Sequence, residues 1–98
     1  MKPDRELLEA AAKACGYVAE WYPNGKCDLV TRQSIGDVIQ CNWNPITNTA
    51  DRYELCKKLG LTLDFNEKFV VGIDGSSADW TNDEDEGRVI VEFAGRVG

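Results

Sequence analysis

The 98-residue sequence contains no histidine, and this absence removes several kinds of chemistry. Histidine is the commonest general base and metal ligand, and it activates the nucleophile in Ser-His-Asp and Cys-His enzymes. Catalysis by carboxylate, lysine or tyrosine side chains remains open, but no constellation of such residues marks it. The sequence therefore favours a non-catalytic protein, and we expect neither catalytic residues nor a cofactor.

The cysteines also lack the spacing of a metal or redox site. No Cys-x-x-Cys pair occurs, so a zinc site would need thiolates from four separate segments. Nothing indicates an oxidising compartment, which argues against disulfides. We expect these residues to be reduced and mostly buried as small apolar side chains: Cys15, Cys27, Cys41 and Cys56.

Long apolar runs are missing as well, since none approaches the ~20 residues that a membrane-spanning helix needs. The first 16 residues carry acids inside their apolar stretch, unlike a signal peptide. We therefore expect a cytoplasmic protein without a membrane segment. A length of 98 residues and a 43% hydrophobic composition predict one globular domain over residues 1–98.

The chain is acidic, with a net charge of −6, which argues against a nucleic-acid partner. Five of the 17 acidic residues lie in one short run, and the remaining 12 nearly balance the 11 basic residues. The run consists of Asp79, Asp83, Glu84, Asp85 and Glu86. Its concentration in one segment indicates either a solvated helix start or a docking patch for a basic partner. A calcium loop does not fit, because Phe93 stands where glutamate is needed.

The first half of the chain predicts a helix followed by a hairpin. Apolar residues in 4–15 recur with a helical period, and Gly16 suits the position after the helix end. Segments 17–22 and 27–30 flank Asn24-Gly25, which favours a tight antiparallel turn.

A third strand is expected next, over residues 38–43, after a turn over residues 34–37. Ile39, Cys41 and Trp43 alternate with polar positions in it, as in a half-buried strand. Pro45 ends that strand, because proline has no backbone N–H to extend a ladder.

A second helix is expected to run from there to about Leu59, where Gly60 ends it. Three residues are candidate N-caps: Thr47, Asn48 and Thr49. Ala50, Tyr53, Cys56 and Leu59, with Leu55 beside them, are expected along its inner side.

Residues 61–65 and 69–73 predict a second hairpin across the turn 66–68, with alternate residues inward. These are Leu61, Leu63, Phe65, Phe69, Val71 and Ile73. The stretch Gly-Ile-Asp-Gly-Ser-Ser that follows is expected to be a loop, since it lacks the lysine of a phosphate-binding loop.

The final segment carries signals of both strand and helix. Val89, Ile90 and Val91 are β-branched, yet apolar residues repeat at helical spacing as far as Val97. Thr81-x-x-Glu84 matches a capping box, which favours the helix. A C-terminal strand stays as the alternative.

Three segments resemble one family. WNPITNTADRYELCKKLGL is similar to the Trp-Asn-Pro segment of small tailed-phage and prophage proteins grouped as the phage ABA-sandwich domain family. The opening DRELLEAAAKACGY and the ending GRVIVEFAGRVG resemble that family's first and last helices, although the ending is shorter here. The resemblance implies an accessory protein acting inside a bacterial host, and helices on both faces of a central sheet.

The expected fold is therefore α+β, a layered sandwich of an antiparallel sheet of about five strands with three helices, in the order α-β-β-β-α-β-β-α. A two-layer sheet ending in a strand is the alternative. The hypothesis for function is a small non-catalytic protein that binds a host or phage macromolecule, with a protein as its partner.

The expected contact surface combines the acidic run with a tryptophan. We expect Trp80 to be exposed there, whereas Trp21 and Trp43 are expected in the core. The full set is Trp80, Asp83, Glu84, Asp85 and Glu86. Two alternatives remain: a small hydrolase or nucleotide-binding protein using carboxylates such as Asp64, Asp74 or Asp79, and a minor virion or assembly component.

Overall fold

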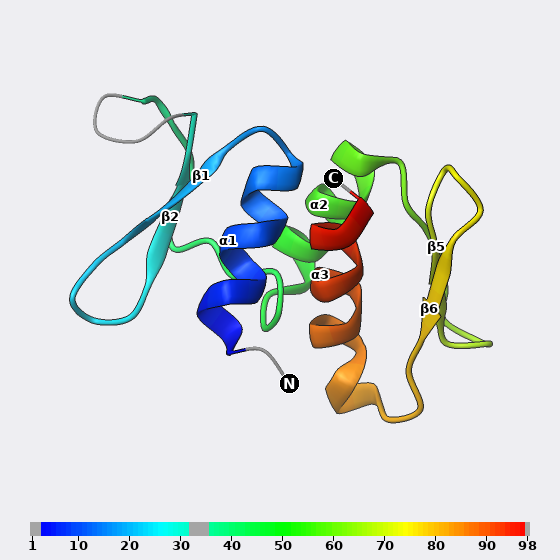
Figure 1. Ribbon diagram of the computed structural model, residues 1–98. Helices are drawn as coiled ribbons and strands as arrows, with labels where there is room; N and C mark the ends of the chain where they lie inside the picture. Colours follow the sequence, from blue (N-terminus) through cyan, green and yellow to red (C-terminus); the bar gives the residue numbers. More distant parts are fainter. Residues whose placement is uncertain (1–2, 32–35, 98) are drawn as a thin grey trace.

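The computed structural model describes residues 3–31 and 36–97 and shows an α+β fold (Figure 1). The described residues form three α-helices and two antiparallel sheets of three strands each. The order is α-β-β-β-α-β-β-β-α. The α+β class and the three helices are thus confirmed. The expected single sheet of about five strands is wrong.

The first sheet follows the first helix. Helix α1 spans Asp4–Ala14 and buries the predicted stripe, and Gly16 takes the left-handed conformation expected after it (φ +83°). Strands β1 (Val18–Trp21) and β2 (Cys27–Val30) form the predicted hairpin, and β3 (Val38–Gln40) pairs with β2. The expected turn at 34–37 falls largely outside the described residues.

The second sheet follows the second helix, α2 (Thr49–Leu59). It consists of β4 (Thr62–Asp64), β5 (Phe69–Val71) and β6 (Ser77–Asp79), in that order. Strand β6 was not predicted, because Ser-Ala-Asp has no apolar alternation, and its first residue was expected to lie in a loop. A 3-10 turn (η1, Asp83–Asp85) then leads into α3 (Glu86–Val97), so the C-terminal segment is helical, not a strand.

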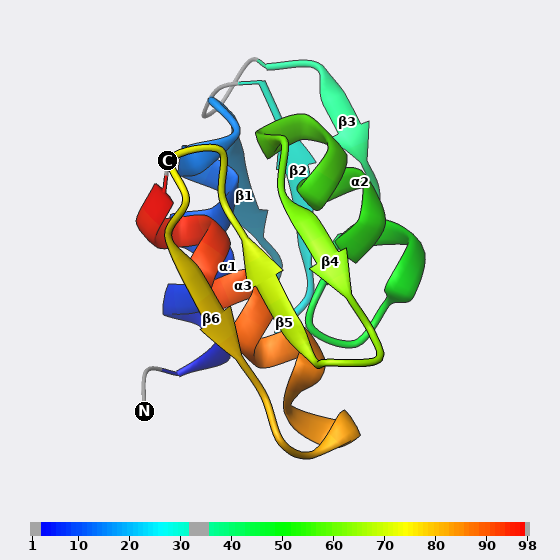
Figure 2. The same ribbon diagram turned by 90° about the vertical axis from the view of Figure 1, so that its right-hand side faces the viewer.

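The helices form the middle layer, and the two sheets lie on either side of it (Figure 1). Figure 2, turned by 90°, shows β4, β5 and β6 in front of α3, with β1 and β2 behind the helices. The expectation of helices on both faces of a central sheet is therefore wrong. Each sheet has the helices on one of its faces, and the helices supply apolar surface for both sheets.

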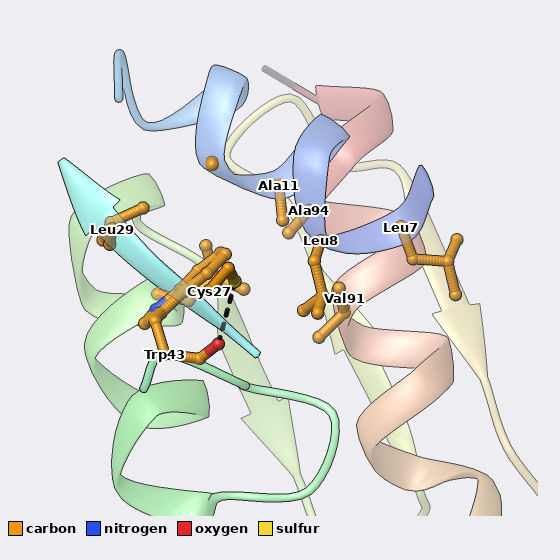
Figure 3. Packing of buried hydrophobic residues seen from close by; sticks show 10 residues of the cluster. Leu7, Leu8, Ala11, Cys27, Leu29, Trp43, Val91 and Ala94 are labelled. Carbon is orange, nitrogen blue, oxygen red and sulfur yellow. Dashed lines mark hydrogen bonds between the residues drawn. The ribbon is translucent and has the colours of Figure 1, made fainter. Parts of the chain in front are cut away.

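Two buried clusters hold these layers together. The larger one joins α1, the first sheet and α3, and Figure 3 shows Ala11 of α1 beside Ala94 of α3. Small residues bring these two helices close, since a Cβ added at Gly95 would lie 2.9 Å from the Ala10 Cβ. The smaller cluster joins the second sheet to α2 and α3: Cys56, Val70, Trp80, Ile90 and Phe93.

The third strand differs from the prediction in length and burial. It ends at Gln40, and both Ile39 and Cys41 are exposed, although Trp43 is buried as expected. Asn42 adopts a positive φ of 51°, which interrupts the extended chain. At the edge of its sheet, β3 leaves Val38 and Ile39 about half exposed, so sequence alternation alone does not bury a strand.

The inward face of the second hairpin is also shifted. Leu63 pairs with Val70, and Val70 is fully buried, so the alternate residues Phe69 and Val71 point to the other face. The predicted inward positions Phe65 and Ile73 are exposed. The prediction placed the odd-numbered residues inward in both strands. The observed register keeps Leu63 inward in β4 but turns the even-numbered Val70 inward in β5.

Helix α2 has the predicted bounds but a different buried side. Gly60 ends it in the left-handed conformation, as expected, and Leu55 and Cys56 are buried. Ala50 and Tyr53, however, lie in solvent. Asp51 and Arg52 are buried in their place, because the helix packs against a loop that these two side chains bind.

Among the described residues, no helix combines the length and apolar character needed to cross a membrane. The four cysteines are free thiols, as expected. Only Cys27 and Cys56 are buried, and burial raises the pKa of each to about 11.

Candidate functional site

The predicted contact surface is divided by the structure. Trp80 is buried in the smaller cluster, with 5% of its surface exposed, so the prediction that it lies in solvent is wrong. It follows β6 directly, and its backbone N–H donates to Lys68 O at 3.0 Å. The ring is covered because the chain turns there from the second sheet towards α3. Trp80 can support the surface but cannot contact a partner.

The acidic residues also take different roles. Asp83 and Glu84 are exposed, and Asp85 is half-buried, within the 3-10 turn. Glu86 begins α3 and accepts a hydrogen bond from the Arg52 Nη1 at 2.6 Å. The expected capping box does not form, since Asn82 occupies the N-cap of the turn and makes no side-chain cap bond. Three acids therefore remain for contact: Asp83, Glu84 and Asp85.

Arg52 and Glu86 belong to a structural joint between α2 and α3. Arg52 is 7% exposed, and its guanidinium also donates to Pro45 O (2.9 Å) and Ile46 O (2.7 Å). Gly87 lies against the same loop, where an added Cβ would come within 2.1 Å of Ile46 O. We call these five residues the interhelix joint. It fixes the position of the acidic turn.

The start of α2 satisfies its own backbone, as the sequence predicts. Among the three candidate caps, Asn48 is the N-cap, and its side chain accepts from Asp51 N at 3.1 Å. Asn44 Oδ1 accepts from Ile46 N and Thr47 N, and Asp51 Oδ2 accepts from Asn44 N. The Asn-Pro segment is thus a structural junction.

A lysine links the acidic turn to the second hairpin. Lys68 Nζ lies 3.5 Å from Asp83 Oδ1 and donates to Thr81 O at 3.3 Å. Lys68 belongs to the turn between β4 and β5, and Phe65 begins that turn. The acidic turn and Phe65 therefore lie at the same end of the molecule.

Phe65 makes an exposed aromatic pair with Tyr53 of α2. Their ring centroids are 6.1 Å apart in an edge-to-face arrangement, and the residues are 48% and 46% exposed. Aromatic side chains are the commonest anchors of protein interfaces. We call Tyr53, Phe65, Asp83, Glu84 and Asp85 the aromatic–acidic surface.

The two aromatic residues were missed as surface residues at the sequence level. Each was assigned to a buried stripe, because Tyr53 is one turn from Cys56 and Phe65 alternates with Leu63. No local signal distinguishes them from core residues. Phe65 is outside because β4 ends at Asp64, and Tyr53 is outside because of the rotation of α2.

The carboxylates of the alternative enzyme hypothesis are separated. Asp64 and Asp79 both lie opposite Phe69, one on each neighbouring strand, which puts them two strand spacings (about 10 Å) apart. Asp64 caps its turn by accepting from Asn66 N and Glu67 N. Asp74 accepts from the Ser76 backbone and hydroxyl, and these bonds lower its pKa. The bonds made by Asp64 and Asp74 stabilise turns.

A further carboxylate lies on the first sheet. Asp28 accepts hydrogen bonds from Tyr22 Oη and from Asn42 N. Both hydrogen bonds lower the pKa of Asp28, and the bond from Tyr22 has the larger effect. The same bond to Asp28 raises the pKa of Tyr22 to about 12. Both groups are thus held in their ordinary ionisation states at neutral pH.

Comparisons with known proteins do not place the chain in a family. No family model matches it, and neither the curated proteins nor the solved structures include a similar protein.

Proposed function

We propose that this chain is a small non-catalytic accessory protein of a tailed phage or prophage that acts in the bacterial host by binding a protein. The resemblance of the Trp-Asn-Pro segment and the two terminal helices supports the phage origin. The observation that carries the binding role is the exposed Tyr53–Phe65 pair at the end of the molecule where Lys68, in the same turn as Phe65, lies 3.5 Å from Asp83 of the acidic turn.

The composition of this surface defines the partner's chemistry. An aromatic pair with about half its area in solvent fits an apolar recess, where it is removed from water. The adjacent acids fit a rim of lysine or arginine side chains, which would guide the encounter over a distance of about 10 Å at moderate salt. We therefore propose a protein partner with an apolar recess beside a basic patch.

The joint behind this surface favours binding without rearrangement. Arg52 and Glu86 fix the start of α3, and Trp80 anchors the segment between β6 and η1. A preformed surface loses less conformational entropy on association than a flexible one. The three acids thus lie between two buried anchors, Trp80 before them and the Arg52–Glu86 pair after them.

The test is affinity capture from infected or induced cells, followed by binding measurements with the purified partner. The first variant replaces Tyr53 and Phe65 by serine, and the second changes Asp83→Asn, Glu84→Gln and Asp85→Asn. We expect each to weaken binding at least about tenfold, with a reduced salt dependence only for the second.

A matched control neutralises three acids elsewhere, by Glu6→Gln, Glu9→Gln and Glu20→Gln on α1 and β1. This variant has the same net charge as the acidic-surface variant and should keep full affinity. Equal capture by all variants, or the absence of any partner that contacts position 65 in a photo-crosslinking experiment, would contradict the proposal.

A further inference from the structure

A second site lies away from the aromatic–acidic surface, between the β1–β2 turn and the junction before α2. It is a pocket of about 240 Å³. Leu8, Trp21 and Trp43 contribute apolar surface, and Lys26 with asparagines 42, 44 and 48 contributes polar groups. Its lining includes no aspartate or glutamate, although the chain has 17 acidic residues.

Two of the asparagines in the lining, Asn44 and Asn48, have a side-chain donor that is not used within the part of the fold that the structure describes. The Oδ1 of Asn44 is occupied by two backbone N–H groups, and the Oδ1 of Asn48 is occupied by Asp51 N. Since an amide has one oxygen and one NH₂ group, the Nδ2 groups of both residues remain to donate. Within residues 3–31 and 36–97, neither Nδ2 group has a hydrogen-bond acceptor in the structure.

A lysine lines the pocket, an arginine lies beside it, and one of its two indoles has an N–H that is unpaired in the described chain and closed off from solvent. Lys26 is exposed, and its ammonium forms no ion pair within the described part of the chain. Arg5 lies over the Trp21 ring, 4.8 Å from its centroid. The Trp21 Nε1 is buried with no acceptor among the described residues. A buried donor without an acceptor is rare in folded proteins.

Two carboxylates lie behind the lining and are already hydrogen-bonded. Asp51 accepts from Asn44 N and Asp28 accepts from Asn42 N, so both face the backbone that carries the pocket residues. They oppose an anion in the pocket, but their acceptor atoms do not line it. The groups that do line it combine amide donors, an ammonium and apolar walls.

We infer that this pocket binds a carboxylate attached to an apolar group, in the form of either an N-acylated amino acid or the carboxyl end of a peptide. The carboxylate would accept from Lys26 and from the amide groups of Asn44 and Asn48, which are charge-assisted bonds. The apolar group would lie against Leu8 and the two indole rings. The pocket volume of about 240 Å³ suits a single apolar residue. It is below the usual range of pockets for drug-sized ligands.

The experiment is an NMR titration of the ¹⁵N-labelled protein with N-acetyl-leucine, with N-acetyl-leucinamide, and with a tetrapeptide that ends in leucine. We expect saturable shifts of the Trp21 indole N–H and of the Asn44 and Asn48 side-chain amides with the acid. The neutral amide should bind at least about tenfold more weakly, because it lacks the charge. Tighter binding of the tetrapeptide identifies a chain end, whereas equal binding identifies the free acid.

Two variants locate the site. Asn48→Asp keeps a good N-cap but places a negative charge in the pocket, so it should abolish acid binding while the fold remains intact. Lys26→Met should weaken binding about tenfold. Lys57→Met, at an exposed lysine on α2, is the matched control and should change nothing.

Three results would overturn the inference. They are no shift with any probe at about 10 mM, equal binding of acid and amide, and undiminished binding in folded Asn48→Asp protein. A probe that causes no shift at about 10 mM would have a dissociation constant well above the millimolar range, which is too weak for a binding site.

Discussion

Helices α2 and α3 begin in opposite ways. The start of α2 has hydrogen-bonded backbone N–H groups, with Asn48 as N-cap and both Asp51 and Arg52 buried. The start of α3 is a 3-10 turn of three acids that make no cap and lie largely in solvent. The two starts meet at one ion pair, Arg52–Glu86. The comparison indicates that the start of α2 uses its own side chains to satisfy its backbone, whereas the acids at the start of α3 remain available to a protein partner.

The largest loss of stability should come from Arg52→Ala, which breaks the ion pair that joins the two helix starts. The change removes one member of a buried pair and leaves Glu86, Pro45 O and Ile46 O without their donor. Removing one partner of such a pair costs about 3–5 kcal/mol of unfolding free energy. Urea unfolding followed by circular dichroism measures it. Glu86→Gln, which keeps a hydrogen-bonding group at a more exposed position, should cost less than half as much.

The next effect is that of Gly87→Ala, for which helix propensity and packing predict opposite signs. Propensity alone predicts stabilisation by about 1 kcal/mol, since alanine favours a helix over glycine. Packing predicts a loss of about 2–3 kcal/mol, because the added Cβ meets the Ile46 carbonyl at 2.1 Å. We expect the loss, in the same unfolding assay. A more stable variant would mean that α3 does not contact the junction loop.

A smaller effect is expected at the cap of α2. Asn48→Ala removes the acceptor for Asp51 N and should lower stability by about 1 kcal/mol, as at other N-caps. Asn82→Ala is its counterpart before α3, where the side chain makes no cap bond, and should cost less than about 0.5 kcal/mol. Equal losses at the two positions would remove the difference between the helix starts.

The smallest effect on stability should come from neutralising the acidic turn. Asp83, with a side chain that is 90% exposed, makes one long ion pair with Lys68. Surface pairs of this kind contribute about 0–1 kcal/mol. The variant Asp83→Asn, Glu84→Gln, Asp85→Asn should therefore unfold at nearly the same urea concentration as the unmodified protein. A large loss would assign these acids to the fold instead of to binding.

Local chemistry explains which features the sequence predicts. The bounds of α1 and α2, the first hairpin and the cap at Asn48 follow from periodicity, Asn-Gly and short polar side chains within a few residues of each other. The helical C-terminal segment was also predicted correctly. All of these depend on neighbours in the chain.

The misplaced features depend on neighbours in space. Trp80 is buried because α3 packs against it, and Phe65 is exposed because β4 ends at Asp64 and Phe65 lies in the turn. Strand β6 is polar and is held by pairing with β5. The layer order, with helices between two sheets, follows from the close contact of α1 and α3 at Gly95, which no single segment encodes.

The most direct measurement is residue-resolved amide hydrogen exchange at the two helix starts. Asp51 N donates to Asn48 Oδ1 and Arg52 N donates to Asn48 O, and both donor residues are buried. We expect these amides to exchange at least about 100-fold more slowly than those of Asp83 and Glu84, because they open only with the surrounding structure. Equal exchange rates at the two starts would contradict the distinction between a structural joint and an available acidic turn.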